Sequence, residues 1–365
     1  MADVDAPSRL SDVGWMSAVT IYDVANLAGV SIKTVSRVLN NEAGVKDATR
    51  EKVREAVKSL GYHPNLSARN LAGSRSYVIV TLVDADLTIH HWRGARAADF
   101  LTRVQLGATV ECRNAGYHFM IELIGREPVE MIAEVRGVLG ALKPDGVLLT
   151  PPSSDDTVVL DLLRAARVPY VRLGSQATGG GGLRLIMDDK GAAQAITQHL
   201  VDLGHTRIGL ILGEPHYGSS LARFAGFRET LEANGLEVDD TLLRQGDFTY
   251  ETGFEGAASL LALPNRPTAI FACSDDMALG CLGAIAEAGL SAPQDVSVAG
   301  FDDSAGARFS YPPLTTVGHP LEELAALSVR ALIAGEVPAD GETDLFAPLP
   351  FRLTIRRSTG PAPQP

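Results

Sequence analysis

A basic segment near the amino terminus carries side chains that suit contacts with nucleic acid. In the run SIKTVSRVLN, the hydroxyls of Ser31, Thr34 and Ser36 are interspersed with the cations of Lys33 and Arg37. Hydroxyl groups near helix starts suit phosphate oxygens, and a guanidinium can fork onto the O6 and N7 atoms of guanine. These residue types predict DNA recognition, with Arg37 reading a base.

Sequence patterns of catalytic sites are missing. The chain has no GxSxG elbow, P-loop or HExxH motif, and its run of four glycines lacks the GxGxxG spacing of a dinucleotide site. Adjacent acids such as Asp302 and Asp303 point in different directions, unlike the facing pair of a glycosidase. Cys112, Cys273 and Cys281 have no CxxC spacing, so we expect small buried hydrophobic residues. We therefore expect no enzyme, no cofactor and no metal site.

Charge is unevenly distributed along the chain. A net charge of −12 and a pI of about 5.1 by themselves disfavour a nucleic-acid partner. Residues 18–76, however, hold nine Lys or Arg against five Asp or Glu, so the acidity lies mainly in the rest of the chain. A small basic module attached to a large acidic body is the asymmetry expected when one end meets phosphate.

Three short helices are predicted to position the basic side chains. Thr20 is expected to cap the first helix, with Asp23 as its capping-box acid, and Gly29 to end it. Ser31 is expected to cap the second helix and Asp47 the third. A helix, a glycine turn and a second helix with a basic outer face indicate a helix-turn-helix, although a plain three-helix bundle has the same pattern.

From Tyr77 onward, short apolar runs alternate with amphipathic segments. Runs such as YVIVTLV, DGVLLT and TAIFACS are typical of buried parallel strands, and segments such as EMIAEVRGVLGAL have the period of a helix. This alternation predicts doubly wound α/β layers arranged in two lobes. A ligand is then expected beyond the carboxyl ends of the strands, in the cleft between the lobes.

Length and composition bound the class of protein. A chain of 365 residues, 45% of them hydrophobic, is too long for one ordinary core and too apolar to be disordered. No stretch approaches the ~18 apolar residues that cross a membrane, and the opening MADVDAPSRLSDVGW lacks the apolar core of a signal peptide. We therefore expect two or three folding units, a cytoplasmic location and no membrane partner.

The chain resembles the LacI/GalR family of transcription factors. The segments VTIYDVANLAGVSIKTVSRVLNN and TREKVREAVKSLGYHPNLSARNLAGSRS resemble its DNA-binding head, and HLVDLGHTRIGLILG and PPLTTVGHP its periplasmic-binding-protein-like core. The resemblance implies a tail (1–17), a helix-turn-helix domain (18–62), a hinge helix and linker (63–76), a two-lobed core (77–358) and a second tail (359–365). Lobe one is expected to comprise 77–189 and 318–343, and lobe two 190–317 and 344–358.

The resemblance implies roles for residues of the head and hinge. Ile32 and Lys33 stand where the family reads base edges, and Leu71 matches the leucine that the family's hinge helix inserts into the minor groove. The positions implied to contact DNA are Thr20, Tyr22, Ser31, Ile32, Lys33, Thr34, Ser36, Arg37, Asn40, Asn65, Ala68 and Leu71. For the hydroxyl and amide groups among them, a helix cap or a solvated side chain is the other interpretation.

Six positions of the body match residues with which the family contacts a saccharide or a related small ligand. They are Asp84, Arg223, Phe248, Ser274, Asp302 and His319. Carboxylate and guanidinium groups can hydrogen-bond vicinal hydroxyls, and an aromatic face can lie against sugar C–H groups. Arg223 and Asp302 could instead form a structural salt bridge or a cap, and Ser274 could simply cap the helix that follows it.

The body departs from the family's pattern directly after Asp84. The segment DLTIHHWRGARAADF is longer than the resemblance predicts, and it places His90, His91 and Trp92 near the expected mouth of the cleft. The interpretations are a surface loop or dimer contact, a ligand contact, or a metal site that uses the two histidines with Asp84 or Asp86. Adjacent histidines seldom chelate one ion, which disfavours the metal site.

These inferences point to a ligand-responsive, sequence-specific DNA-binding regulator. We expect a repressor of carbohydrate-metabolism genes that a saccharide releases from DNA. A homodimer is expected on a palindromic double-stranded operator, because two-fold protein symmetry mirrors such a site. The alternatives are a sugar-binding protein with a vestigial head, which the basic face argues against, and a sugar-metabolising enzyme fused to a head, which turnover would identify.

Overall fold

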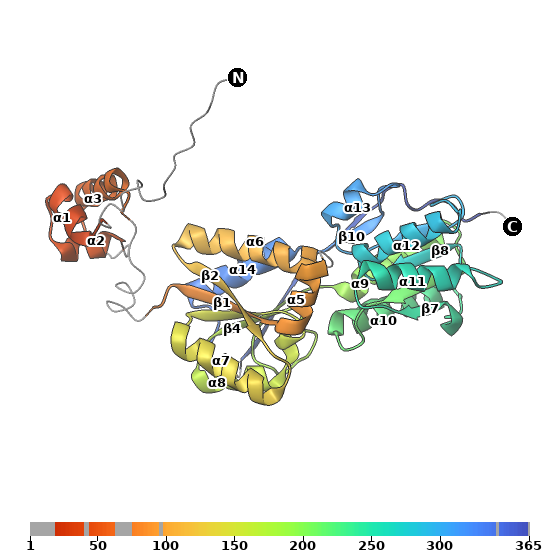
Figure 1. The fold of residues 1–365 in the computed structure, drawn as a ribbon, viewed down its shortest axis with the longest axis horizontal. Helices are drawn as coiled ribbons and strands as arrows, with labels where there is room; N and C mark the ends of the chain where they lie inside the picture. Colours follow the sequence, from red (N-terminus) through yellow and green to blue (C-terminus); the bar gives the residue numbers. More distant parts are fainter. Residues whose placement is uncertain (1–18, 40–43, 63–74, 95–97, 341–342, 364–365) are drawn as a thin grey trace, which may run out of the picture. The chain divides into compact units, whose positions relative to one another are not determined.

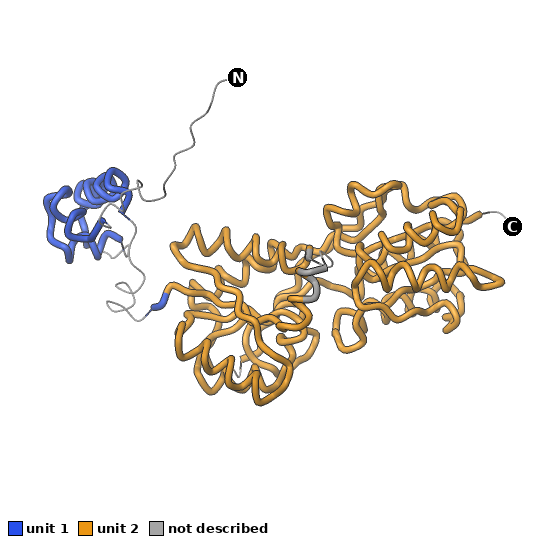
Figure 2. Tube along the Cα trace, viewed as in Figure 1, with its two compact units in different colours: residues 1–76 blue, residues 77–365 orange. Residues whose placement is uncertain are grey.

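The chain folds as two compact units, Met1–Ser76 and Tyr77–Pro365, which Figure 2 shows in separate colours. The computed structural model describes residues 19–39, 44–62, 75–94, 98–340 and 343–363. The first unit is a small all-α helix-turn-helix and the second is a pair of parallel α/β lobes, so the expected fold class is confirmed. None of the helices in the described ranges is both long and apolar enough to cross a membrane.

The first unit packs three helices around a small apolar core (Figure 1). The helices are α1 (Ile21–Ala28), α2 (Ile32–Leu39) and α3 (Asp47–Leu60). Gly29 (φ 64°) and Gly61 (φ 60°) end α1 and α3 in the left-handed conformation that favours glycine. The expected cap of α3 is wrong by one position, because Lys46 is the cap and Asp47 the first helical residue. There its carboxylate still suits the positive end of the helix dipole.

Lobe one of the second unit is a six-stranded parallel sheet, in the order β11-β5-β4-β3-β1-β2. Its strands are β1 (Val78–Asp84), β2 (His118–Ile124), β3 (Gly146–Leu149), β4 (Tyr170–Leu173), β5 (Gly182–Met187) and β11 (Asp344–Leu349). α6 (Ala98–Ala115) and α14 (Leu321–Ala334) pack together on one face, and α7 (Pro128–Leu142) and α8 (Thr157–Ala166) on the other (Figure 1). α5 (Ala85–Gly94) follows β1 directly, and a short 3-10 turn, η2 (Ser153–Asp155), follows β3.

Lobe two is a four-stranded parallel sheet, in the order β7-β6-β8-β9. Its strands are β6 (Ile208–Leu212), β7 (Leu243–Gln245), β8 (Ala269–Ala272) and β9 (Ser297–Ala299). α9 (Asp189–Asp202) packs on α10 (Gly218–Ala233), and α11 (Tyr250–Leu261) packs on α12 (Asp275–Glu287). The remaining elements are η3 (Asp240–Leu242), α13 (Ala305–Phe309) and an antiparallel ribbon of β10 (Thr316–Gly318) and β12 (Arg352–Thr354).

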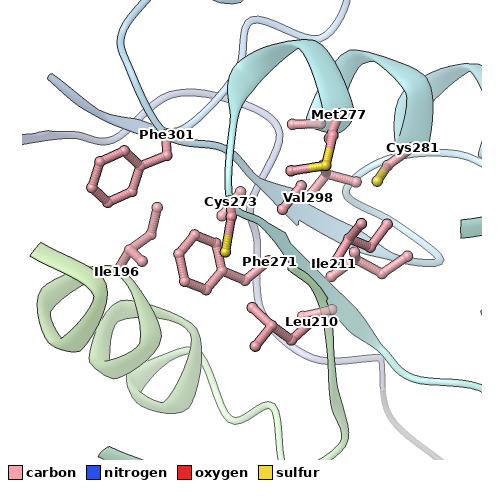
Figure 3. Packing of buried hydrophobic residues seen from close by; sticks show 14 of the residues in the cluster. Ile196, Leu210, Ile211, Phe271, Cys273, Met277, Cys281, Val298 and Phe301 are labelled. Atoms are coloured by element: carbon pink, nitrogen blue, oxygen red, sulfur yellow. The ribbon is translucent and has the colours of Figure 1, made fainter. Parts of the chain in front are cut away.

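Buried apolar side chains pack on each of the two parallel sheets of the second unit and form its hydrophobic cores. In lobe two, Phe271 of β8 lies beside Ile196 of α9, and Met277 of α12 belongs to the same buried cluster, as Figure 3 shows. Cys273 and Cys281 belong to this core and Cys112 to that of lobe one, and all three are buried and free. The cysteines are therefore small buried hydrophobic residues, as expected.

The chain crosses between the lobes at three places. The crossings lie between β5 and α9, between β10 and α14, and between β11 and β12. The expected assignment of residues 344–349 to lobe two is wrong, because they form β11 and pair in parallel with β5 at the edge of the lobe-one sheet. Asp344 itself accepts a hydrogen bond from Arg184 at 2.9 Å, which anchors the start of that strand in lobe one. Residues 344–349 therefore belong to lobe one.

Candidate DNA-binding face and effector pocket

The start of α1 is organised by a carboxylate. Asp23 accepts hydrogen bonds from the backbone N–H of Thr20 at 2.8 Å and from its hydroxyl at 2.7 Å. The hydroxyl bond in particular lowers the pKa of the Asp23 carboxyl, which is exposed. Tyr22, on the first turn, is exposed and places its phenol in solvent.

Helix α2 presents the predicted polar face because its apolar side chains are buried. Val35 and Val38 lie in the core of the head, whereas Ile32 and Lys33 are exposed. Ser31 accepts a hydrogen bond from the N–H of Thr34 at 3.2 Å and therefore caps the helix. The hydroxyls of Ser31 and Thr34 are also 2.9 Å apart and bonded to each other. Ser36, like Thr34, is partly exposed.

Arg37 lies over the turn that follows α2. A Cβ atom added at Gly44 would come within 3.1 Å of Nη2 of Arg37, and Gly44 has the left-handed φ of 87°. Arg37 as a whole residue is partly buried. Asn40, Asn65, Ala68 and Leu71, also expected at DNA, lie outside the described residues.

The six positions expected to contact a small ligand line one pocket of the second unit. Residues of both lobes form its wall, from the carboxyl end of β1 to the start of α12. The lining residues are Val83, Asp84, Leu87, Thr88, Trp92, Asp99, Phe100, Leu101, Thr150, Pro151, Gly174, Asp189, Glu214, Tyr217, Ser219, Arg223, Asp247, Phe248, Ser274, Asp276, Asp302 and His319. This is the place that the doubly wound topology predicts for a ligand.

Arg223 is held in a buried salt bridge beneath the pocket. Its Nε atom donates to Asp189 at 2.8 Å and Nη1 donates to the carbonyl of Cys273 at 2.6 Å. The guanidinium carbon lies 3.6 Å from the centre of the Phe301 ring. Burial opposes its charge, but the carboxylates of Asp189 and Asp302 raise the pKa of Arg223 above its usual value. Arg223 therefore forms the structural salt bridge that was the alternative interpretation, and its side chain also lines the pocket.

Asp302 and His319 meet at the floor of the pocket. Nδ1 of His319 lies 3.7 Å from a carboxylate oxygen of Asp302, too far for a hydrogen bond. That buried nitrogen has no hydrogen-bond partner in the part of the chain that the structure describes. Asp302 also has a φ of 122°, a conformation that costs a residue with a side chain about 1–3 kcal/mol. Strain and an unpartnered polar atom at one place are typical of a binding site.

Phe248 and Ser274 complete the lobe-two wall in different ways. The Phe248 ring packs directly on Gly213, where a Cβ atom would clash at 2.1 Å, and its centre lies 6.0 Å from that of Tyr217. Ser274 caps α12, because its hydroxyl accepts from the N–H of Met277 at 3.2 Å. Ser274 is therefore a helix cap, as the alternative interpretation predicted, and it also lines the pocket.

Asp84 is engaged on both carboxylate oxygens. One oxygen accepts from the N–H of Leu87 at 2.7 Å, and the other forms an ion pair with Arg126. The first of these bonds caps α5, so residues 85–94 are helical and the surface-loop interpretation does not hold for them. Leu87, Thr88 and Trp92 place this helix on the pocket. His90 and His91 lie within α5, and no group of three potential metal ligands occurs in the described ranges.

Sequence reasoning missed the residues that join the lobes at the pocket. Arg103 of α6 in lobe one donates to the carbonyls of Asp302 at 3.0 Å and His319 at 2.7 Å. Its charge also faces Asp99 and Glu322. Burial raises the pKa of Asp99, which Arg103 lowers and Asp302 raises further. No local pattern marks such contacts, because the partners are about 200 positions apart in sequence.

Comparisons with known proteins match both units of the chain to known families. A family model described as bacterial regulatory proteins of the lacI family matches residues 20–65, and one for a periplasmic binding protein-like domain matches residues 197–359. The transcriptional regulator CelR of Thermobifida fusca is 36% identical over 317 residues, which are 86% of this chain and 91% of that protein. The ribose operon repressor of Escherichia coli (strain K12) is 33% identical and covers 86% and 92%.

Solved structures match over nearly the whole chain. A complex of the transcriptional regulator CelR with cellobiose is 34% identical, has a TM-score of 0.68 and covers 93% of this chain and 99% of its own. A Lac repressor dimer bound to operator and an anti-inducer is 30% identical, with a TM-score of 0.72 and coverages of 94% and 100%. The chain therefore belongs to the lacI family of bacterial regulatory proteins: it is a helix-turn-helix transcriptional regulator with a periplasmic-binding-protein-like domain, and not an enzyme.

Proposed function

We propose that this protein is a repressor of carbohydrate-metabolism genes that binds a palindromic operator as a homodimer and is released by a saccharide. The pocket of the second unit is the observation that carries the proposal. Its wall combines carboxylates with aromatic rings, the pair of groups that binds the hydroxyls and the C–H faces of a sugar. The cellobiose complex and the ribose operon repressor among the relatives support the same ligand class.

On the DNA side, α2 is assigned to the major groove. Ile32 and Lys33 are exposed at its amino end, and Arg37 follows Lys33 by one turn. The hydroxyls of Thr20, Tyr22, Ser31, Thr34 and Ser36 and the amide of Asn40 are assigned to phosphate. Residues 63–76 are assigned to a hinge that orders on operator, in which Leu71 enters the minor groove beside Ala68 and Asn65.

Exposed apolar side chains of the second unit support the homodimer. Phe309 is the last residue of α13 and Tyr311 follows the helix, and these side chains are 87% and 90% exposed. Leu106 and Val110 lie one turn apart on α6, and each exposes about half of its surface. Large exposed apolar groups mark protein contacts, and a two-fold axis brings the same patch of two copies together. The palindromic operator follows from that symmetry.

Release by sugar requires the two ends of the chain to be coupled. A hinge helix of about two turns is unstable by itself, so its order depends on DNA and on the spacing that the dimer imposes. A ligand that closes the pocket changes that spacing, and we expect a coupling free energy of about 1–3 kcal/mol. Thermodynamic reciprocity then requires operator to weaken sugar binding by the same factor by which sugar weakens operator binding.

The experiment is a titration carried out with and without operator. A thermal-shift panel of uncharged mono- and disaccharides first identifies a sugar that stabilises the native state. Its affinity is then measured by calorimetry with free protein and with the protein–operator complex. Leu71→Ala serves as the control, since it should weaken operator binding and leave sugar affinity of the free protein unchanged. Equal sugar affinities in the two titrations would exclude the switch.

A further inference from the structure

The second unit begins at a strained residue. The peptide bond between Ser76 and Tyr77 joins the two units, and Tyr77 is the first residue of the second unit (Figure 2). Tyr77 has a φ of 59°, which lies in the left-handed region that glycine favours and that a bulky residue rarely adopts. Such a conformation persists only where neighbouring groups hold it in place, and it is typical of positions whose geometry serves a function.

Backbone hydrogen bonds hold Tyr77 in this conformation. Its N–H donates to a carboxylate oxygen of Asp145 at 2.8 Å, and its carbonyl accepts from the N–H of His118 at 2.8 Å. The N–H of Asp145 in turn donates to the carbonyl of Val78 at 2.9 Å. Two hydrogen bonds therefore join Asp145 to residues 77 and 78, and the third bond fixes the peptide that lies between them.

The side chain of Tyr77 adds a packing contact to these bonds. Its ring centre lies 5.3 Å from that of Tyr117, at an interplanar angle of 59°, and aromatic rings at this separation attract each other. Tyr117 is buried in the core of lobe one, so the contact joins Tyr77 to a fixed part of the molecule. Residues Tyr77, Tyr117, His118 and Asp145 together are called the entry anchor below.

The entry anchor lies at the amino edge of the lobe-one sheet. β1 begins directly after Tyr77 and β3 directly after Asp145, and β1 pairs with β2 on one side and β3 on the other. All seven residues of β1 are buried. The effector pocket begins at Asp84, at the opposite end of this strand and about 20 Å away at the usual rise per residue. A rotation at Tyr77 would therefore turn the preceding segment with respect to a rigid sheet.

We propose that the entry anchor fixes the angle at which the DNA-binding segment joins lobe one, and that Tyr77 and Asp145 are positioning residues for operator binding. The inference rests on the proposed function, because a fixed angle matters when two heads of a dimer must meet two half-sites at a set spacing. If Tyr77 could rotate about φ, ordering it on DNA would cost conformational entropy. Its strained and hydrogen-bonded conformation removes that cost before DNA binds.

The experiment compares three duplexes of DNA by fluorescence anisotropy. They are a palindromic duplex that the unaltered full-length protein selects from a random pool, the same duplex with one base pair inserted at its centre, and a duplex of random sequence. Asp145→Ala should weaken binding to the selected duplex about tenfold and binding to the random duplex less than about twofold, since the phosphate contacts of the head are unchanged. The inserted base pair should weaken binding of the unaltered protein at least about tenfold and of Asp145→Ala less than about threefold, because a loosened attachment can follow the displaced half-site.

Substitutions at Tyr77 separate backbone conformation from packing. Tyr77→Gly should reproduce the result of Asp145→Ala, because glycine populates many conformations. Tyr77→Asn loses the ring but tolerates a left-handed conformation, so it should weaken binding to the selected duplex less than about threefold. The double variant should bind no more weakly than Tyr77→Gly, since both substitutions release the same anchor. Asp161→Ala, which removes an exposed carboxylate from α8 of the same lobe, is the control and should change none of these affinities.

Urea denaturation and sedimentation first establish that each variant is folded and has the oligomeric state of the unaltered protein. If Asp145→Ala does not fold, Asp145→Asn, which keeps an acceptor oxygen and should show a smaller loss in the same direction, takes its place beside the Tyr77 variants. The inference is overturned if Tyr77→Gly binds the selected duplex as tightly as the unaltered protein, loses equally on random DNA, or discriminates as strongly against the inserted base pair. In these cases the unaltered protein still selects a palindrome and the proposed function stands. If it selects none, the proposed function fails together with this inference.

Discussion

The recognition face of the head and the effector pocket of the body hold their polar side chains in opposite ways. On α2, Lys33 is exposed and the buried residues are apolar. In the pocket, Arg223 and Asp189 are buried and bonded to each other, and Asp302 is held in a strained conformation. Binding and stability are therefore separable in the head, whereas in the pocket the same side chains serve both.

The largest effect is expected from removing the buried cation. Arg223→Ala leaves Asp189 buried without its partner and should lower the free energy of unfolding by about 3–5 kcal/mol, measured by urea denaturation. Arg228→Ala, on the same helix, loses only a half-exposed pair with Glu232 and should cost below about 1 kcal/mol. Similar small losses in both variants would show that the pocket separates binding from stability as the head does.

The head should give the converse result. Arg37→Ala should weaken operator binding by about 1–3 kcal/mol and relax sequence preference, with much less effect on random DNA. The free energy of unfolding should change by less than about 1 kcal/mol, because Arg37 is only partly buried. Fluorescence anisotropy on both DNAs measures the difference. Arg54→Ala on α3 is the control for a general loss of positive charge. If Arg37→Ala weakens binding to operator and to random DNA equally, Arg37 contacts only phosphate.

Within the pocket, a substitution of Asp302 should weaken ligand binding with little loss of stability. In this it should resemble a substitution in the head and differ from Arg223→Ala. The Asp302 side chain is partly exposed, and among the described residues its nearest ion-pair partner is His319, whose Nδ1 lies 3.7 Å away. Asp302→Asn should weaken sugar binding about tenfold, by turning a charge-assisted hydrogen bond into a neutral one, and leave a folded protein that binds operator. Asp303→Asn is the control, since the neighbouring carboxylate faces Arg356 and Arg308 and not the pocket. If Asp302→Asn and Asp303→Asn lower sugar affinity equally, the effect comes from a change in the loop that holds both residues and not from the Asp302 carboxylate.

The smallest effect is expected from pH, and it concerns the body. His205 is fully buried among the hydroxyls of Thr268 and Ser297 and the carbonyl of Gly360, and burial lowers its pKa. The unfolded chain then binds the proton more readily, so stability is complete above the unfolded pKa of about 6.5 and falls below it, by at most about 1.4 kcal/mol per pH unit. Urea titrations between pH 7.5 and 5.5 measure the slope. His205→Gln should flatten it, and an unchanged slope would assign the pH dependence to other groups.

The regular elements of the fold follow from local pattern, and the irregular ones do not. Each apolar run singled out in the sequence, such as YVIVTLV and TAIFACS, forms a strand, because parallel strands covered on both faces are continuously apolar. β11 escaped prediction because Pro348 interrupts its pattern. The proline is tolerated there because β11 lies at the edge of its sheet, where one side of the strand needs no partner.

The candidate site was predictable in position and not in its internal partners. Resemblance located all six pocket residues, yet the salt bridge of Arg223 with Asp189 and the bonds of Arg103 to Asp302 and His319 join distant parts of the chain. The sequence left a surface loop open as one interpretation of residues 85–94, because the cap of α5, Asp84, is the last residue of a strand. When a helix cap is also the last residue of a strand, no turn residues separate the two elements, and the start of the helix is hard to recognise in the sequence.

The threefold crossing of the chain between the lobes has a consequence for the order of events during synthesis. The head consists of one continuous segment, so it can fold as soon as it leaves the ribosome. Lobe one instead takes α14 and β11 from the last tenth or so of its long span, and lobe two takes β12 after them. Lobe one cannot complete its sheet until residue 349 has emerged, and lobe two cannot pair β12 with β10 until residue 354 has emerged. A translating ribosome therefore carries a finished DNA-binding head well before it carries anything that could respond to a sugar.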